Sequence, residues 1–137
     1  MVVFNKKNQN IVMLEAARDS VNYKEMIEKV IKSVEKQGYK EIKADHEDYE
    51  MPHLLVNQST DIAFTPDVSA KKNEGQAYFE IATKEKDTIQ LINKWKLLET
   101  LAHMKKGSFQ LFVPHGHMKF AQDMIEAHKI NAKLVKI

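Results

Sequence analysis

The stretch Ala77-Tyr78-Phe79-Glu80-Ile81-Ala82 decides the fold of this chain. Its aromatic and apolar residues make it the most strongly β-like run in the sequence. One acid, Glu80, interrupts the run, and a second, Asp67, lies just upstream in Thr65-Pro66-Asp67-Val68. A charged carboxylate is costly to bury unless it is paired or bound to a metal. Two acids on neighbouring strands therefore indicate a divalent-cation site suited to phosphate chemistry.

Hydrophobic periodicity on either side of this run predicts helices alternating with short strands. Helices are expected over 22–37, 88–105 and 118–128, and strands over 39–44, 54–56, 62–64, 78–82, 109–113 and 132–137. Residues 71–75 read as a hairpin turn, while 2–4 read as a strand and 11–17 as either a strand or a helix. The order α-β-β-β-α-β-α-β predicts one α/β (α+β) domain. Its central mixed sheet has an antiparallel first part and a parallel last part, flanked by helices.

Composition bounds the function without defining it. The 137 residues suit a single domain, and the absence of cysteine excludes disulfides and thiolate metal sites and fits a cytoplasmic location. Neither a membrane-spanning stretch nor a signal-peptide pattern is expected. The net charge of +2 is too small to argue for nucleic-acid binding by itself. Six lysines against three acids between Lys84 and Lys106 mark a local basic segment, best explained as a solvated helix face.

The pair Pro66-Asp67 followed by Glu80 on a strand resembles the Pro-Asp…(Asp/Glu)-x-Lys signature of the PD-(D/E)XK nuclease superfamily. The resemblance extends over the order of elements from about residue 20 to the C-terminus. It implies a restriction-endonuclease-like fold for one nuclease-like domain over 1–137, with 1–19 as an N-terminal extension. In one position the chain departs from the signature, because Ala82 stands where the family has its lysine.

The resemblance implies a role for each matching residue. Asp67 and Glu80 correspond to the Mg²⁺ ligands, and Ile81 offers the backbone carbonyl that completes the ligand set. The family lysine orients or activates the attacking water. Lys84 lies on the same strand face, roughly 7 Å beyond Ala82, and a lysine stem spans that distance. A relocated lysine at Lys84 and a decayed, inactive site both remain open. The acid that some members carry on the first helix corresponds to Glu25 or Glu28.

Simpler interpretations stand beside these roles. The Glu80 carboxylate can be satisfied by an ion pair with a lysine or by hydrogen bonds from backbone N–H groups. Asp67 can be a turn residue that follows a proline. His115-Gly116-His117 is read first as a turn entering a helix, and otherwise as a metal-chelating pair. Gln90 and Lys94, one turn apart, either line a phosphate groove or belong to a solvated helix face.

Two functional hypotheses follow. The first is a Mg²⁺-dependent nuclease that hydrolyses phosphodiesters in DNA, with Asp67, Glu80 and Lys84 as catalytic residues. By analogy with small domains of this kind, it would act as a homodimer. The second is a catalytically inactive nucleic-acid-binding or protein-interaction module on the same fold. This hypothesis is based on Ala82, which stands at the position of the motif lysine.

Overall fold

The computed structural model describes residues 21–137. In chain order its elements are α2 (Val21–Lys36), β1 (Lys40–Ala44), β2 (Leu55–Asn57), β3 (Ile62–Phe64), β4 (Val68–Lys72), β5 (Gly75–Ile81), α3 (Thr88–Met104), β6 (Phe109–Val113), α4 (Met118–Ala127) and β7 (Lys133–Lys136). The strands and helix expected within 1–20 lie outside the described residues. Across residues 21–137, every helix is too short or too polar to cross a bilayer.

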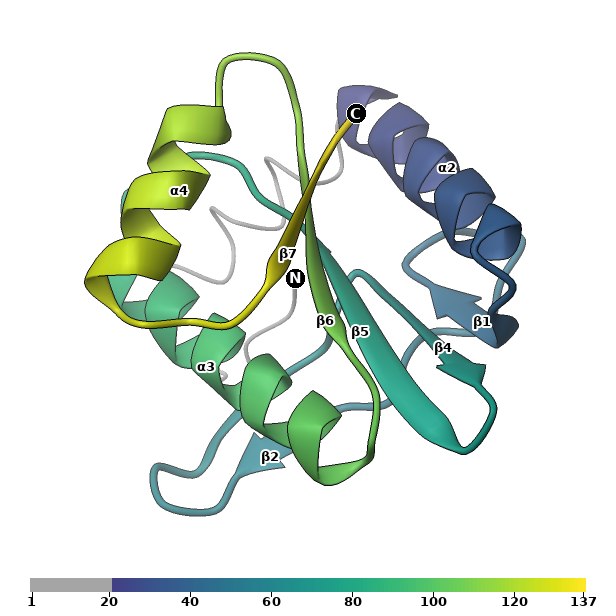
Figure 1. Ribbon diagram of the computed structural model, residues 1–137, viewed down its shortest axis with the longest axis horizontal. Coiled ribbons are helices and arrows are strands. Elements are labelled where there is room, and N and C mark those ends of the chain that lie inside the picture. The colour runs from purple at the N-terminus through teal and green to yellow at the C-terminus, as the bar shows by residue number, and fades with distance from the viewer. Residues whose placement is uncertain (1–20) are drawn as a thin grey trace.

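Five strands form a mixed sheet in the order β1-β4-β5-β6-β7 (Figure 1). The pairs β1–β4 and β4–β5 are antiparallel, whereas β5–β6 and β6–β7 are parallel. This arrangement confirms the predicted mixed sheet with an antiparallel first part and a parallel last part. The α+β class with helices flanking the sheet is confirmed as well.

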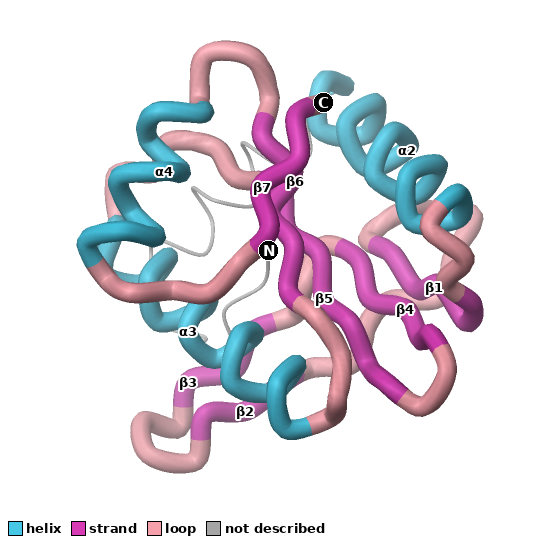
Figure 2. The backbone as a smooth tube through the Cα atoms, in the orientation of Figure 1, coloured by secondary structure: helices cyan, strands magenta, loops and turns pink. Residues whose placement is uncertain are grey.

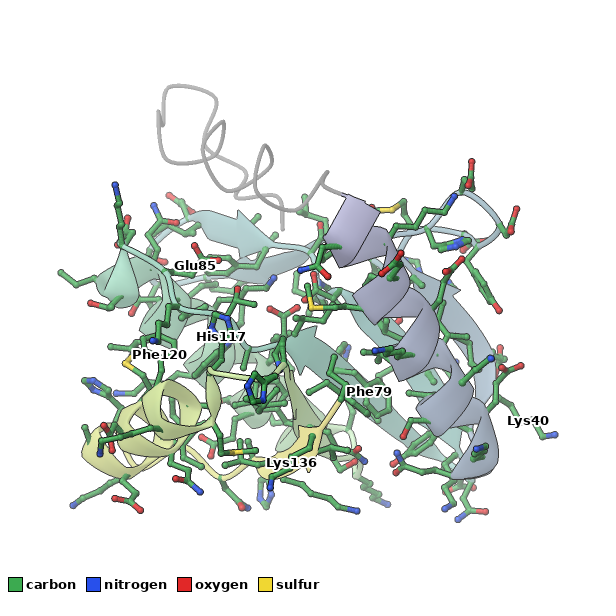
Figure 3. The ribbon with its side chains drawn as sticks, turned by 90° about the horizontal axis from the view of Figure 1, so that it is seen from above. Lys40, Phe79, Glu85, His117, Phe120 and Lys136 are labelled. Atoms are coloured by element: carbon green, nitrogen blue, oxygen red, sulfur yellow. The ribbon has the colours of Figure 1, made fainter. Side chains whose placement is uncertain are left out.

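The sheet separates two apolar clusters, one on each face. Side chains of alternate residues of a strand point to opposite faces. Phe79 accordingly packs with α2, whereas Tyr78 packs with α3. Figure 3 shows Phe79 between the sheet and α2, with Lys40 pointing outward at the far edge. Trp95 of α3 is fully buried in the second cluster, as expected of an aromatic residue on the apolar stripe of a helix.

The antiparallel partner of β5 is β4, a strand that the sequence did not predict. Residues 71–75 were expected to be a hairpin turn, and the turn is present but shorter: Asn73 and Glu74 form it, whereas Lys71 and Lys72 end β4 and Gly75 begins β5. The short strands β2 and β3 pair only with each other within the described sheets, as a separate hairpin (Figure 2). Asp67 therefore precedes the strand that pairs with β5 instead of following it. Local pattern missed β4 because its sequence, VSAKK, has too few apolar residues to read as a strand.

Two glycines allow the start of β5 to lie directly against the segment between α3 and β6. A Cβ atom on Gly107 would lie 1.7 Å from the carbonyl oxygen of Gln76, and one on Gly75 would lie 2.2 Å from that of Lys106. The backbone bonds from Gln76 N to Lys105 O (3.1 Å) and from Tyr78 N to Ser108 O (3.0 Å) hold this junction together. The close approach of backbone to backbone requires glycine at both positions.

We expect Gly107→Ala to lower the free energy of unfolding by about 1–3 kcal/mol, because the added methyl group forces β5 and the α3–β6 connection apart. Urea unfolding monitored by circular dichroism measures the loss. The amide resonances of Gln76 and Tyr78 should shift with it. An unchanged unfolding midpoint would contradict the close approach described above.

Candidate functional site

The fold places Asp67 and Glu80 side by side. Val68 is the register partner of Phe79 in the β4–β5 pair, so Asp67 comes one step further along, opposite Glu80. The backbone N–H of Asp67 donates to Glu80 Oε2 at 2.6 Å, and the N–H of Ile81 donates to Asp67 Oδ2 at 2.9 Å. Each carboxylate is thus fixed by the backbone of the opposite segment. The two acids singled out from the sequence share one location in the structure.

Both acids are buried, and a lysine accompanies them. Asp67 is 1% exposed, and Glu80 and Lys94 are 0% exposed. Lys94 Nζ of α3 lies 2.8 Å from Glu80 Oε1. Removing charges from water costs several kcal/mol per ion, and a close opposite charge offsets part of that cost. Glu80 is therefore satisfied by a lysine and by a backbone donor, which is the simpler interpretation given for it from the sequence. We refer to Asp67, Glu80 and Lys94 as the charged cluster.

Lys94 also retains hydrogen-bonding capacity at this location. Its contact with Glu80 is close, but it is not aligned as a hydrogen bond, and Lys94 Nζ has no hydrogen-bond partner among residues 21–137. The same holds for the buried Gln90 Oε1, one helical turn earlier. Buried polar atoms are normally satisfied by protein or by water. An ammonium group with donors to spare beside the Glu80 carboxylate suits a water molecule.

Sequence reasoning named Lys94 only as a groove or surface residue, and its full burial shows that the solvated-face interpretation is wrong for it. A signal for burial was present in the spacing. Lys94 follows Leu91 by three residues and precedes Leu98 by four, so it falls within the apolar stripe of α3. The Asp87 side chain caps this helix by accepting from Gln90 N at 3.0 Å, as predicted.

The first helix contributes a tyrosine to the site instead of an acid. The Tyr23 hydroxyl donates to Asp67 Oδ1 at 2.7 Å and lies 3.3 Å from Asp45 Oδ2. Glu25 and Glu28, the two acids considered for this place, are both exposed, and Glu28 contacts His46 at 3.0 Å. Tyr23 falls at helical spacing with the apolar residues of α2, so periodicity alone gives no signal for the role of its hydroxyl group.

Lys84 does not lie on the strand face where it was expected. Strand β5 ends at Ile81, and Lys84 is an exposed residue of the connection that follows. Ala82 is fully buried in the apolar cluster that contains Leu91 and Trp95. A lysine at position 82 would have to bring its charge into that cluster, which explains why alanine suits the position.

The histidine pair forms a turn at the start of α4, as the first interpretation predicted. Gly116 has a φ of +87°, a left-handed conformation that favours glycine. His117 Nδ1 accepts a hydrogen bond from Lys84 N at 3.0 Å, so the pair ties the β5–α3 connection to α4. Figure 3 shows His117 at the beginning of α4, close to Glu85 of that connection. Burial of the ring, and then the positive charge of Lys84, lower the pKa of His117.

Carboxylate oxygens are ligands that Mg²⁺ prefers, and Mg²⁺ is commonly held by one or two carboxylates together with water and substrate phosphate. In this conformation the oxygens of Asp67 and Glu80 contact Tyr23, Ile81 N, Asp67 N and Lys94. Within residues 21–137, no group of three or more His, Cys, Asp or Glu side chains is arranged to hold a metal ion.

Comparison with known proteins assigns no family to this chain. No family model matches it, and neither a curated protein nor a solved structure does.

We expect Lys94→Met to lower the free energy of unfolding by about 3–5 kcal/mol, because it leaves Glu80 buried without its cation. Lys96→Met, the same change at an exposed lysine of α3, should stay within about 0.5 kcal/mol. Urea unfolding of Lys94→Met, Glu80→Gln and the double variant completes a double-mutant cycle. The double variant should lose less than the sum of the single losses. Strict additivity would contradict the ion pair.

We expect the His117 ring to titrate below the usual value of about 6.5, because burial and Lys84 disfavour its charged form. The unfolded chain then binds the proton first, so this contribution to stability is complete above about pH 6.5 and is lost as the pH falls toward the folded-state pKa.

Ring-proton NMR measures this titration. Lys84→Gln should raise the pKa of His117, whereas Lys86→Gln, at an exposed neighbouring lysine, should leave it nearly unchanged. A midpoint at or above that of histidine in the urea-unfolded chain would contradict the buried setting.

Proposed function

We propose that this protein is a Mg²⁺-dependent phosphodiester hydrolase with a restriction-endonuclease-like fold, in which Lys94 takes the place of the motif lysine. The element order supports the proposal. With the β2–β3 hairpin set aside, the order is α2, three antiparallel strands, α3, a parallel strand, α4 and a last strand. This is the order implied by the resemblance to PD-(D/E)XK nucleases.

One observation carries the proposal: a buried lysine of α3, Lys94, contacts one of the two buried carboxylates. Lys94 Nζ lies 2.8 Å from Glu80 Oε1, and the other oxygen of that carboxylate accepts the N–H of Asp67. Two carboxylates and one ammonium group are thus joined in one contact network. These groups, which come from β5, from the residue before β4 and from α3, support the proposal because the motif combines the same three chemical components.

Each residue has a role in the proposed reaction. Asp67, Glu80 and the carbonyl of Ile81 would hold Mg²⁺, which would supply Lewis acidity for the phosphate and the attacking water. Lys94 would donate from Nζ to hold that water, or the phosphate oxygen beside it, in position. Tyr23 would orient the Asp67 carboxylate through its 2.7 Å hydrogen bond. On the same resemblance we propose DNA as the substrate, a homodimer as the functional unit and the cytoplasm as the location.

A second candidate function rests on the enclosure of the charged cluster. Its three side chains are at most 1% exposed, so a phosphodiester cannot touch them in this conformation. Hydrolysis requires the cluster to open, whereas a purely structural role for the ion pair does not. The alternative proposal is accordingly a catalytically inactive module that binds nucleic acid or another protein on the same fold.

We expect the protein to cleave DNA with Mg²⁺ or Mn²⁺, and expect Asp67→Asn, Glu80→Gln and Lys94→Gln each to lower the rate by about 10²-fold or more. Lys84→Gln is the matched control: it removes the same charge from an exposed lysine and should keep the activity. Single-stranded, duplex and branched DNA are the substrates. Circular dichroism verifies that each variant is folded at the assay temperature.

The outcomes separate the two candidate functions. Cleavage that survives Asp67→Asn and Glu80→Gln would overturn this site, and loss in Lys84→Gln but not in Lys94→Gln would return the lysine role to Lys84. Folded wild-type protein that neither cleaves DNA nor takes up Mn²⁺ in titration calorimetry would favour the inactive module.

A further inference from the structure

A hollow lined by basic side chains lies on the face of the sheet that α3 partly covers. It has a volume of about 200 Å³, and its lining includes Lys43 of β1, Lys71 of β4, Tyr78 of β5, and Lys105, directly after α3. A second, more open hollow of about 500 Å³ shares Lys71 and Lys105 and adds Lys106. We name the two adjoining hollows together the lysine groove.

Positive charge exceeds negative charge along this groove. Its lining carries four lysines and His53 against two acids, Glu41 and Glu74. Lys43 also pairs with Glu50 at 2.9 Å, and Lys71 lies 4.0 Å from Glu41. The acids in both pairs are well exposed, and exposed ion pairs contribute little stability. An incoming anion can therefore replace these acids at small cost.

Two contacts position cations at the groove. Lys105 Nζ donates to the Tyr78 hydroxyl at 3.0 Å and lies 5.7 Å from the centre of that ring. Lys43 Nζ lies 2.9 Å from His53 Nε2. The Tyr78 and Ser69 side chains, both at least nine-tenths buried, form the polar floor between these cations. Fixing a lysine before binding reduces the entropy lost when it meets a ligand.

The groove and the charged cluster share strand β5. Tyr78 and Glu80 are two residues apart on the same face of β5, a separation of about 7 Å. One strand of duplex nucleic acid advances about 3.4 Å per nucleotide, so this separation corresponds to about two nucleotides. A chain of phosphates seated in the groove would therefore lie within a few nucleotides of Glu80 and Lys94, which it could contact only after the enclosed cluster opens.

We propose that the lysine groove binds the backbone phosphates of a nucleic-acid strand and directs that strand to the charged cluster. The inference rests on the proposed function, because the charged cluster is the proposed site of cleavage to which the nucleic-acid strand is directed. Lysine ammonium groups bind phosphates as point charges without reading bases. The groove therefore supplies affinity that depends on salt and is independent of sequence.

Binding in EDTA tests the groove separately from cleavage. Fluorescence anisotropy with labelled oligothymidylate and a labelled duplex of equal length compares the wild type with the triple variant Lys43→Gln, Lys71→Gln, Lys105→Gln. The variant should bind at least about tenfold more weakly. The plot of the logarithm of the association constant against the logarithm of the salt concentration should become less steep, with the magnitude of its slope smaller by about 2–3. The matched control removes three exposed lysines elsewhere, with Lys29→Gln, Lys32→Gln and Lys119→Gln. The control variant should bind as the wild type does.

Every outcome decides for or against the groove. Equal losses in both triple variants, unchanged binding in the groove variant, no binding by the wild type, or equal competition by polyglutamate would each overturn it. Loss of DNA binding in the groove variant alone, together with no cleavage by the wild type in Mg²⁺, would support the groove and contradict the proposed hydrolase activity. Cleavage that depends on Glu80, together with unchanged DNA binding by the groove variant, would support the proposed hydrolase activity and contradict the groove.

Discussion

The ion pair between Lys94 of α3 and Glu80 of β5 joins a helix to the sheet without contact with water. Because an uncompensated charge at either position would be costly to bury, the pair fixes how α3 sits on the sheet. Glu80 also accepts from Asp67 N, and Asp67 accepts from Ile81 N and Tyr23. The network thereby connects α2, β4, β5 and α3, and both proposed functions depend on its geometry.

Packing on this face of the sheet explains why alanine suits position 82. Ala82 faces the apolar cluster around Trp95, where a lysine side chain would be costly. Lys94 reaches Glu80 from the helix side, from within an apolar stripe that provides the burial.

The lysine groove and the charged cluster occupy one face of the sheet but differ in exposure. Lys71 and Lys105 are exposed and hold weak partners, whereas Glu80 and Lys94 are enclosed. A polyanion would meet the groove first, because long-range attraction acts on exposed charge. Recognition and chemistry would then be separate steps, with opening of the cluster between them.

The sequence by itself determined the helices, the mixed sheet, and the choice of Asp67 and Glu80 as candidate site residues, because periodicity and an acid inside an apolar run are local signals. Only the tertiary structure decided that Asp67 directly precedes the antiparallel partner of β5, because VSAKK in β4 becomes a strand through its pairing with β1 and β5. Tertiary structure also decided which lysine contacts Glu80. Lys84 lies beyond the end of β5, whereas Lys94, fourteen residues after Glu80 in the sequence, contacts it from α3. Contacts between residues distant in sequence leave no local periodicity, so their partners are set by packing.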